Sequence, residues 1–222
     1  MKKYLFFLIT FFGVINLFAQ VQNSDTTLVI NKHKFRFIKK EIDSEKVKLS
    51  IKRNSKIIYT ENLDAEGLAA LEFPDFDKDG NKDLMLIYMG NNFTYYLYLF
   101  DKKSNTFKRI EGFERFPEAM QIKTNSKYYY SYHRAGCADM NWVSDLFYIE
   151  NFKSIHIGHI YGNGCETKEY PLKIEIYKVE DNKEENKKLF KTLPYKKNIP
   201  SFGDKWDFIE KYWNANYNKF KV

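Results

Sequence analysis

Several residue types and motifs are scarce or missing in this chain, and each absence narrows the range of functions. The two cysteines and four histidines show no C-x-x-C or H-x-x-x-H spacing, which argues against a zinc site of the usual kind. No G-x-S-x-G elbow, H-E-x-x-H motif, phosphate-binding glycine loop or carboxylate pair of glycosidase type is present. With no catalytic constellation visible, the sequence predicts a protein that is not an enzyme.

Long apolar runs are also missing beyond the N-terminal segment. Lys2 and Lys3 precede a nearly unbroken apolar stretch that ends at Phe18, and Ala19 offers a small residue for cleavage before Gln20. This pattern is typical of a secretory signal peptide over residues 1–19. Residues 20–222 are then expected to form a single domain of an exported bacterial protein, either periplasmic or secreted.

The positive charge of the chain is diffuse. Removing Lys2 and Lys3 from the net charge of +7 leaves +5 for the mature protein. Lysines alternate with acidic residues along the chain, and no arginine-rich motif or basic helix is present. We therefore expect a solvated, mildly cationic and monomeric protein that binds no nucleic acid.

The local pattern is that of β-structure. Short segments rich in β-branched and aromatic residues alternate with polar turns, and we expect strands at 27–30, 34–37, 47–51, 56–60, 84–89, 94–100, 106–110, 128–132, 142–149, 154–161 and 172–179. Near the C-terminus, Trp206, Ile209, Tyr212 and Trp213 recur at helical spacing, which predicts one amphipathic helix within 203–217. The chain is therefore expected to be all-β with a C-terminal helix.

Residues 75–83, D-F-D-K-D-G-N-K-D, match the first nine positions of an EF-hand-type calcium loop. Short oxygen-bearing side chains stand at alternate positions, and Gly80 takes the sharp turn. Calcium prefers about 6–8 oxygen ligands, which such a loop directs at one centre. The predicted ligands of a Ca²⁺ ion are Asp75, Asp77, Asp79, Asn81 and Asp83. The alternative is a solvated acidic turn without a metal.

The loop departs from an EF-hand at its end. The twelfth position is Leu86, which cannot supply the usual bidentate carboxylate, and residues 84–89 form an apolar run typical of a buried strand. We expect the loop to lead into a strand and to bind calcium in the weak range of about 10⁻⁴–10⁻³ M.

A calcium loop followed directly by a strand resembles the FG-GAP/VCBS class of β-propeller proteins, through Asp75, Asp77, Asp79, Gly80, Asp83 and Leu84. The segment from Phe73 to Phe107 more narrowly resembles small secreted five-bladed propeller-like proteins that inhibit lysozyme-like effectors of bacterial secretion systems. Weak repeats of strand, polar turn and aromatic residue along the chain agree with roughly five blades. The resemblance implies a propeller-like domain, a structural calcium ion and a muramidase as the protein partner.

The inhibitory S-G-x-x-Y loop implied by this resemblance has one comparable stretch, Ile157-Gly158-His159-Ile160-Tyr161, with isoleucine in place of the serine. A second candidate surface lies around residues 128–142, where tyrosines precede His133 and Arg134. Aromatic and arginine side chains anchor many protein interfaces. The predicted partner-binding residues are Tyr132, His133, Arg134, Trp142, Gly158 and Tyr161.

The isolated pair Cys137 and Cys165 predicts a disulfide bond in an exported protein. A zinc site formed by both cysteines with His133 and His159 is the alternative, as is a thiol nucleophile at Cys137. His156 and His159 stand three residues apart on one predicted strand, so we expect them on opposite faces and not in a shared metal site.

The sequence thus predicts an exported calcium-binding protein that binds a protein partner. The alternative is an envelope adhesion module that binds glycan or protein through exposed aromatics such as Trp142. A calcium-dependent hydrolase is a third reading, for which no acid and base are visible.

Overall fold

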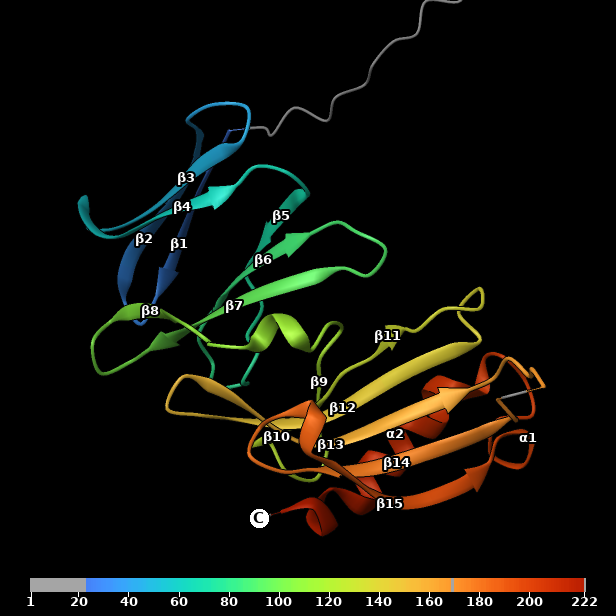
Figure 1. The fold of residues 1–222 in the computed structure, drawn as a ribbon. Coiled ribbons are helices and arrows are strands. Elements are labelled where there is room, and N and C mark those ends of the chain that lie inside the picture. Colours follow the sequence, from blue (N-terminus) through green and yellow to red (C-terminus); the bar gives the residue numbers. More distant parts are fainter. Residues whose placement is uncertain (1–22, 169, 222) are drawn as a thin grey trace, which may run out of the picture.

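The structure is a computed structural model that describes residues 23–168 and 170–221. It contains three antiparallel sheets of four, four and seven strands and a C-terminal helix. Two of the sheets form one part of the molecule, and the third sheet with the helix forms the other (Figure 1). The predicted signal peptide, residues 1–19, lies outside the described residues.

The first sheet is a meander of four strands in chain order, β1 (Ser24–Ile30), β2 (His33–Glu41), β3 (Lys46–Arg53) and β4 (Lys56–Asp64). Phe35 and Phe37 on β2 are buried, as is Lys39 on the same face, while Lys34 and Arg36 are exposed on the other face. Asn31-Lys32 and Asn54-Ser55 have positive φ angles. Two such residues in a row form the tight turns that suit twisted hairpins.

The second sheet is also a four-stranded meander, formed by β5 (Leu68–Glu72), β6 (Leu84–Tyr88), β7 (Thr94–Asp101) and β8 (Thr106–Arg109). It shares one hydrophobic core with the first sheet. The ring of Phe35 lies 5.6 Å from that of Phe100 and 5.5 Å from that of Phe107, edge to face in both cases. The residues 75–83 lie in the loop between β5 and β6.

The third sheet has the order β15-β14-β13-β12-β10-β9, and β11 pairs with β12. Its strands are β9 (Met120–Gln121), β10 (Tyr128–Tyr130), β11 (His133–Arg134), β12 (Asn141–Glu150), β13 (Lys153–Asn163), β14 (Lys173–Val179) and β15 (Lys187–Pro194). Short 3₁₀ segments Phe113–Arg115, Glu184–Asn186 and Tyr217–Phe220 and the one-turn helix α1 (Tyr195–Asn198) connect or end the elements.

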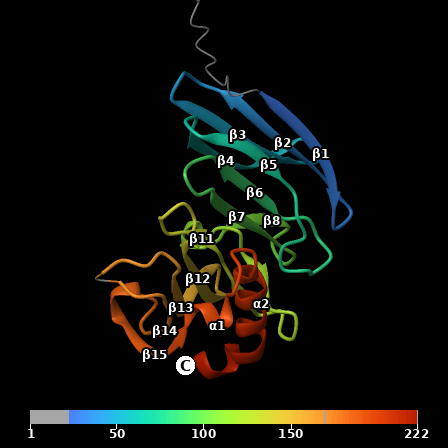
Figure 2. The ribbon, with the colours of Figure 1, turned by 90° about the vertical axis from the view of Figure 1, so that its right-hand side faces the viewer.

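Helix α2 (Asp204–Asn216) covers one face of the third sheet (Figure 2). Trp213 is fully buried and its Nε1 donates a hydrogen bond of 2.8 Å to Ser144 Oγ on β12. The predicted C-terminal helix is thereby confirmed, and its apolar stripe is explained by this packing.

A third hydrophobic cluster joins the two parts of the molecule through the opposite face of the third sheet. Phe116 stacks on Phe147 of β12 with ring centroids 4.2 Å apart, and Phe113 beside it packs against Phe76 from the loop between β5 and β6. Leu97 on β7 belongs to the same cluster. The loop between β5 and β6 is therefore packed near the junction of the second and third sheets.

The predicted five-bladed propeller is wrong. Propeller blades are similar four-stranded sheets arranged around a central channel. Here the described residues form three separate sheets, of which the last has seven strands and a covering helix. The repeated pattern of strand, polar turn and aromatic residue comes from successive hairpins, which any antiparallel meander contains. The all-β prediction agrees with the observed sheets.

Candidate metal centre

The backbone of residues 73–83 forms a closed loop that links neighbouring strands. The Asp83 amide donates a hydrogen bond of 2.7 Å to the Pro74 carbonyl. The Asp83 carboxylate, only 1% exposed, accepts hydrogen bonds of 2.9 Å from the amides of Phe76 and Phe100. One side chain therefore holds the loop against both its own start and strand β7, and β6 follows directly, as predicted from the apolar run.

Three of the five predicted calcium ligands converge. One carboxylate oxygen from each of Asp75, Asp77 and Asp83 lies within 4.8 Å of the other two. Oxygens bound to one calcium ion at about 2.3–2.6 Å lie at most about 5 Å apart, so this spacing fits a shared ion. The turn that brings them together uses Gly80 at a φ of 88°, a backbone conformation that favours glycine.

The other two predicted ligands interact with each other. Asp79 Oδ1 accepts hydrogen bonds from the amide of Asn81 (2.8 Å) and from its Nδ2 (2.9 Å). Asp79 Oδ2 lies 3.1 Å from Lys102 Nζ, which also donates to the Asp79 carbonyl. In this arrangement a lysine partly compensates the acidic loop, and an ion would be held by Asp75, Asp77 and Asp83.

Two carboxyl groups of the loop have raised pKa values. Burial, with repulsion from Asp79 and Asp75, raises the pKa of Asp77. Burial raises the pKa of Asp83 to about 7, although the Phe100 and Phe76 amides act in the opposite direction. A divalent cation at this point would favour the ionised form of each carboxyl group. Leu86 is fully buried, so nothing at the twelfth position completes the ligand set.

The predicted disulfide is confirmed. Cys137 and Cys165 are bonded, with Cα atoms 6.2 Å apart. Both the zinc site that used these cysteines and the thiol nucleophile are therefore excluded. Cys137 lies in a turn in which Cys137, Ala138 and Asp139 all have positive φ, and the fully buried Lys205 of α2 donates hydrogen bonds to the Asp139 carbonyl (2.8 Å) and carboxylate (2.9 Å).

The six predicted partner-binding residues do not lie on one exposed surface. Trp142 is fully buried, Tyr132 is 8% exposed, and Gly158 packs under helix α2. Arg134 is exposed and bonded through its backbone to Asn92 on the β6–β7 connection. Of the six predicted residues, His133, Arg134 and Tyr161 are at least partly exposed to solvent. A partner-binding role for any of them stays a prediction.

The prediction that His156 and His159 lie on opposite faces is wrong. The pairing of β12 with β13 shifts register between Leu146 and Phe147, which leaves Ile157 as an extra residue on β13. Such a bulge puts both histidines on the same face. Asp145 Oδ1 lies 2.8 Å from His159 Nδ1 and 3.0 Å from His156 Nε2. Burial alone would raise the pKa of Asp145, but the hydrogen bonds from both imidazoles hold it below its usual range.

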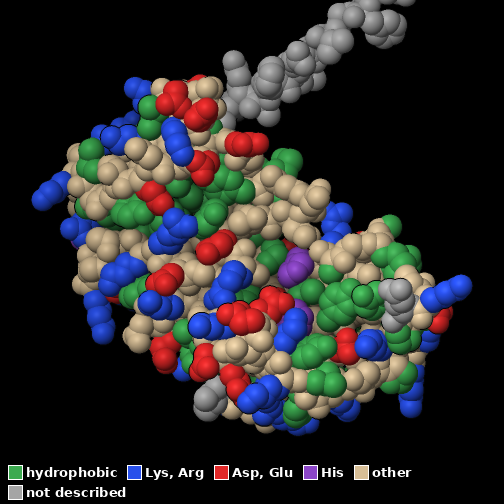
Figure 3. Space-filling view, viewed as in Figure 1, with side chains coloured by type: hydrophobic (Ala, Val, Ile, Leu, Met, Phe, Trp, Pro, Cys, Tyr) green, Lys and Arg blue, Asp and Glu red, His purple; other side chains and the backbone are tan. Residues whose placement is uncertain are grey.

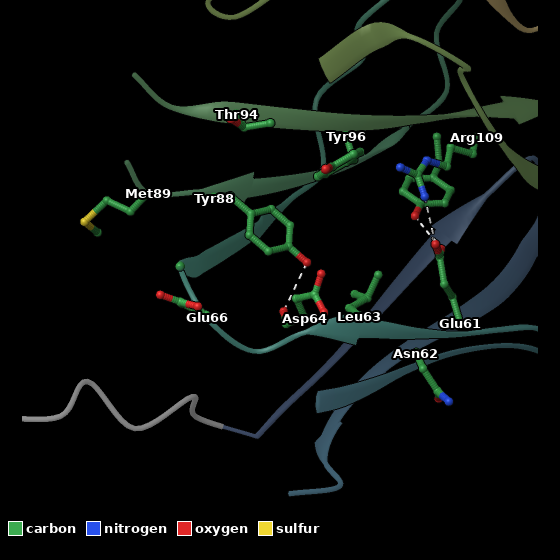
Figure 4. Close-up of a pocket in the computed structure, with 12 residues that line it drawn as sticks. Glu61, Asn62, Leu63, Asp64, Glu66, Tyr88, Met89, Thr94, Tyr96 and Arg109 are labelled. Carbon is green, nitrogen blue, oxygen red and sulfur yellow. Dashed lines mark hydrogen bonds and ion pairs between the residues drawn. The ribbon is translucent and has the colours of Figure 1, made fainter. Parts of the chain in front are cut away.

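A pocket of about 490 Å³ lies between β4 and the second sheet (Figure 4). Glu61, Asp64 and Glu66 supply carboxylates, and Tyr88 and Tyr96 supply rings. Glu61 is fully engaged, since Oε1 accepts from Arg109 Nη1 (2.9 Å) while Oε2 accepts from the hydroxyls of Tyr59 and Tyr98. The Arg109 guanidinium also lies 4.4 Å from the centre of the Tyr96 ring. Sequence reasoning did not find this pocket, because its residues come from strands of two sheets.

Comparisons with known proteins give a weak structural match. No protein-family model matches the chain, and no curated protein matches it. One solved structure, that of a Xanthomonas type IV secretion system related protein, is similar with a TM-score of 0.47 and 13% sequence identity, over 77% of this chain and 98% of that chain. The FG-GAP/VCBS resemblance therefore depends on the loop motif alone.

Within residues 23–168 and 170–221, no helix is both long and apolar enough to cross a bilayer. The disulfide is typical of proteins in oxidising, extracytoplasmic compartments.

Proposed function

We propose that this protein is an exported, non-enzymatic binding protein in which a calcium ion stabilises the loop between β5 and β6. The observation that carries the proposal is the convergence of Asp75, Asp77 and Asp83. Because Asp83 also binds the amide of Phe100, an ion here would fix the loop relative to strand β7. In this proposal calcium has a structural role.

The partner we propose is a lysozyme-like muramidase, a class of protein with a basic surface. The support is the pocket between β4 and the second sheet, where Glu66 presents an exposed carboxylate beside Tyr88 and Tyr96. Asp64 adds a second exposed carboxylate, which pairs with Lys46. A lysine or arginine of a partner would find both charge complementarity and aromatic faces there. Elsewhere, on the face in Figure 3, basic and acidic side chains are interspersed, so this local acidity matters more than the net charge.

The proposal that the protein is not an enzyme is supported by the hydrogen bonds and covalent bonds that its candidate reactive groups already make. Glu61, the most buried of the three pocket carboxylates, accepts hydrogen bonds from Arg109, Tyr59 and Tyr98 and is not free to transfer protons. The two cysteines are bonded to each other. The adhesion alternative loses its main residue, because Trp142 has no exposed surface with which to bind a glycan.

Thermal unfolding in EDTA and in millimolar calcium tests the metal proposal. For a dissociation constant of about 10⁻⁴–10⁻³ M, 1 mM calcium stabilises the protein by about 0.4–1.4 kcal/mol. In a chain of this size the midpoint then rises by about 1–6 °C. The double variant Asp75→Asn, Asp77→Asn should lose this rise, whereas Asp181→Asn, in an exposed turn, should keep it. An equal rise in both variants would refute the site.

Calorimetric titration against a lysozyme-type muramidase, with a peptidoglycan cleavage assay, tests the partner. We expect micromolar or tighter binding that Glu66→Lys weakens at least about tenfold by placing like charge in the pocket. Glu166→Lys, an equal charge change on an exposed loop after β13, is the matched control. Binding that both variants leave unchanged would remove the pocket from the proposal. No binding by the wild type at micromolar concentration would remove the muramidase.

A further inference from the structure

Three of the four histidines of the chain gather around one buried carboxylate on the third sheet. Asp145 on β12 pairs with His159 on β13. Two positions along β12 on either side, Phe147 pairs with His156 of β13 and Val143 pairs with His133 of β11. Alternate residues of a strand share a face, as do directly paired residues. All four polar side chains therefore project from the face that is not covered by α2.

The donor atoms are close enough to share one ion. Oδ1 of Asp145 lies 2.8 Å from His159 Nδ1 and 3.0 Å from His156 Nε2, and the ligand atoms of the three residues all lie within 4.8 Å of one another. In a tetrahedral zinc site with bonds of about 2.0–2.1 Å, donor atoms are about 3.3 Å apart. The two oxygen–nitrogen distances would have to widen by about 0.3–0.5 Å to reach this spacing.

Two polar atoms of the cluster make no hydrogen bond among the described residues. Among the described residues, Asp145 Oδ1 makes all the hydrogen bonds of the carboxylate and Oδ2 makes none. Nδ1 of His133 is buried and has no hydrogen-bond partner. A pocket of about 480 Å³ is lined by His133, Asp145 and His156. Its other lining residues include the acidic Glu184 and Glu185 and the basic Arg115 and Lys183. Histidine side chains are visible in the hollow between the two parts of the molecule in Figure 3.

We propose that Asp145, His156 and His159 bind a transition-metal ion of the Zn²⁺ class, with a further coordination position that faces the pocket on the side of His133. Imidazole and carboxylate donors suit zinc and its neighbours, whereas calcium prefers oxygen alone. The ion would replace the hydrogen bonds that the two imidazoles now make to Asp145, and the one between His156 Nε2 and the Gly158 carbonyl (2.9 Å). The ring nitrogens that face Asp145 would bind without their protons.

Titration of the metal-free wild-type protein with Co²⁺ tests the proposal, because tetrahedral Co²⁺ has a visible ligand-field spectrum. We expect one Co²⁺ per chain, displaced by one Zn²⁺, and a raised unfolding midpoint with Zn²⁺. His156→Gln and His159→Gln should each weaken binding at least about tenfold. His33→Gln, which changes the one histidine outside the cluster, should bind like the wild type.

Two further measurements keep the outcome clear. The Asp75→Asn, Asp77→Asn variant should bind Zn²⁺ like the wild type, since it alters only the oxygen-lined loop. Circular dichroism of each metal-free variant checks that it is folded, and the wild-type titration stands even if a histidine variant unfolds. Absence of Co²⁺ and Zn²⁺ binding by the wild type at micromolar concentration would overturn the proposal. Binding that survives His159→Gln, or is lost equally in His33→Gln, would also overturn it.

Discussion

Lys205 is the side chain whose removal should destabilise the protein most clearly without creating a clash. It is fully buried in the first turn of α2, and its ammonium group binds the carboxylate and carbonyl of Asp139. The rings of Phe202 and Trp206 lie 3.9 and 4.4 Å from Nζ. One charge therefore holds the helix against the left-handed turn that carries Cys137.

The perturbation is Lys205→Met, which keeps the length and the apolar contacts and removes the charge. Loss of one partner from a buried ion pair costs about 3–5 kcal/mol, because the other charge is left without compensation. Asp139 keeps 20% of its side chain exposed and still accepts from the Tyr132 hydroxyl, which places the cost near about 3 kcal/mol. The unfolding midpoint should then fall by about 6–12 °C.

Thermal unfolding followed by circular dichroism measures this effect against Lys211→Met on the same helix. Lys211 forms an i,i+4 pair with Asp207 at 3.0 Å and is 78% exposed, so its removal should cost only about 0.3–0.5 kcal/mol. A double-mutant cycle with Asp139→Asn should recover most of the loss as coupling energy. A Lys205→Met protein no less stable than Lys211→Met would refute this account of the buried pair.

Three further predictions concern stability. Gly162→Ala would place a Cβ 2.0 Å from the buried Trp142 ring and should cost about 1–3 kcal/mol or more in chemical denaturation, whereas Gly203→Ala, with no atom within 4 Å, should be neutral. Cys165→Ser should lower stability by about 3–4 kcal/mol, and dithiothreitol should reproduce this loss in the wild type but not in the variant. Burial raises the pKa of Tyr129 to about 12. The contribution of neutral Tyr129 to the free energy of unfolding should therefore be complete below about pH 10 and be lost as the pH rises to about 12. Tyrosinate absorbance and the unfolding midpoint, followed over the same pH range, would show this loss.

Much of the local structure could be predicted from the sequence. Alternating apolar residues located most strands, because one face of each strand lies in a core. The acidic pattern of residues 75–83 predicted that Asp75, Asp77 and Asp83 lie close together, since their spacing and Gly80 determine the turn. The helix and the disulfide followed from periodicity and from the presence of a single cysteine pair.

The sequence could not predict features that depend on distant partners. Strand β5 reads Leu-Ala-Ala-Leu-Glu, which has no β-propensity of its own and is a strand because β6 pairs with it. The arrangement of the sheets follows from packing between side chains far apart in sequence, such as Phe35 with Phe107. The bulge at Ile157 has no local signature, so the histidine cluster was not visible until strands β12 and β13 were paired.

Strand β15 ends the third sheet, and its outer edge is unpaired among the described residues. Its outer backbone groups have no neighbouring strand in the sheet order, and Leu189 and Phe190 are 58% and 40% exposed. Such an edge is a template for pairing with another chain. Lys187, Lys188 and Lys191 lie on the same strand, where Lys187 pairs with Glu184 and Lys188 with Glu180. Two copies aligned edge to edge would bring these side chains together. Lysines on an exposed strand edge are a common means by which proteins oppose such edge-to-edge pairing.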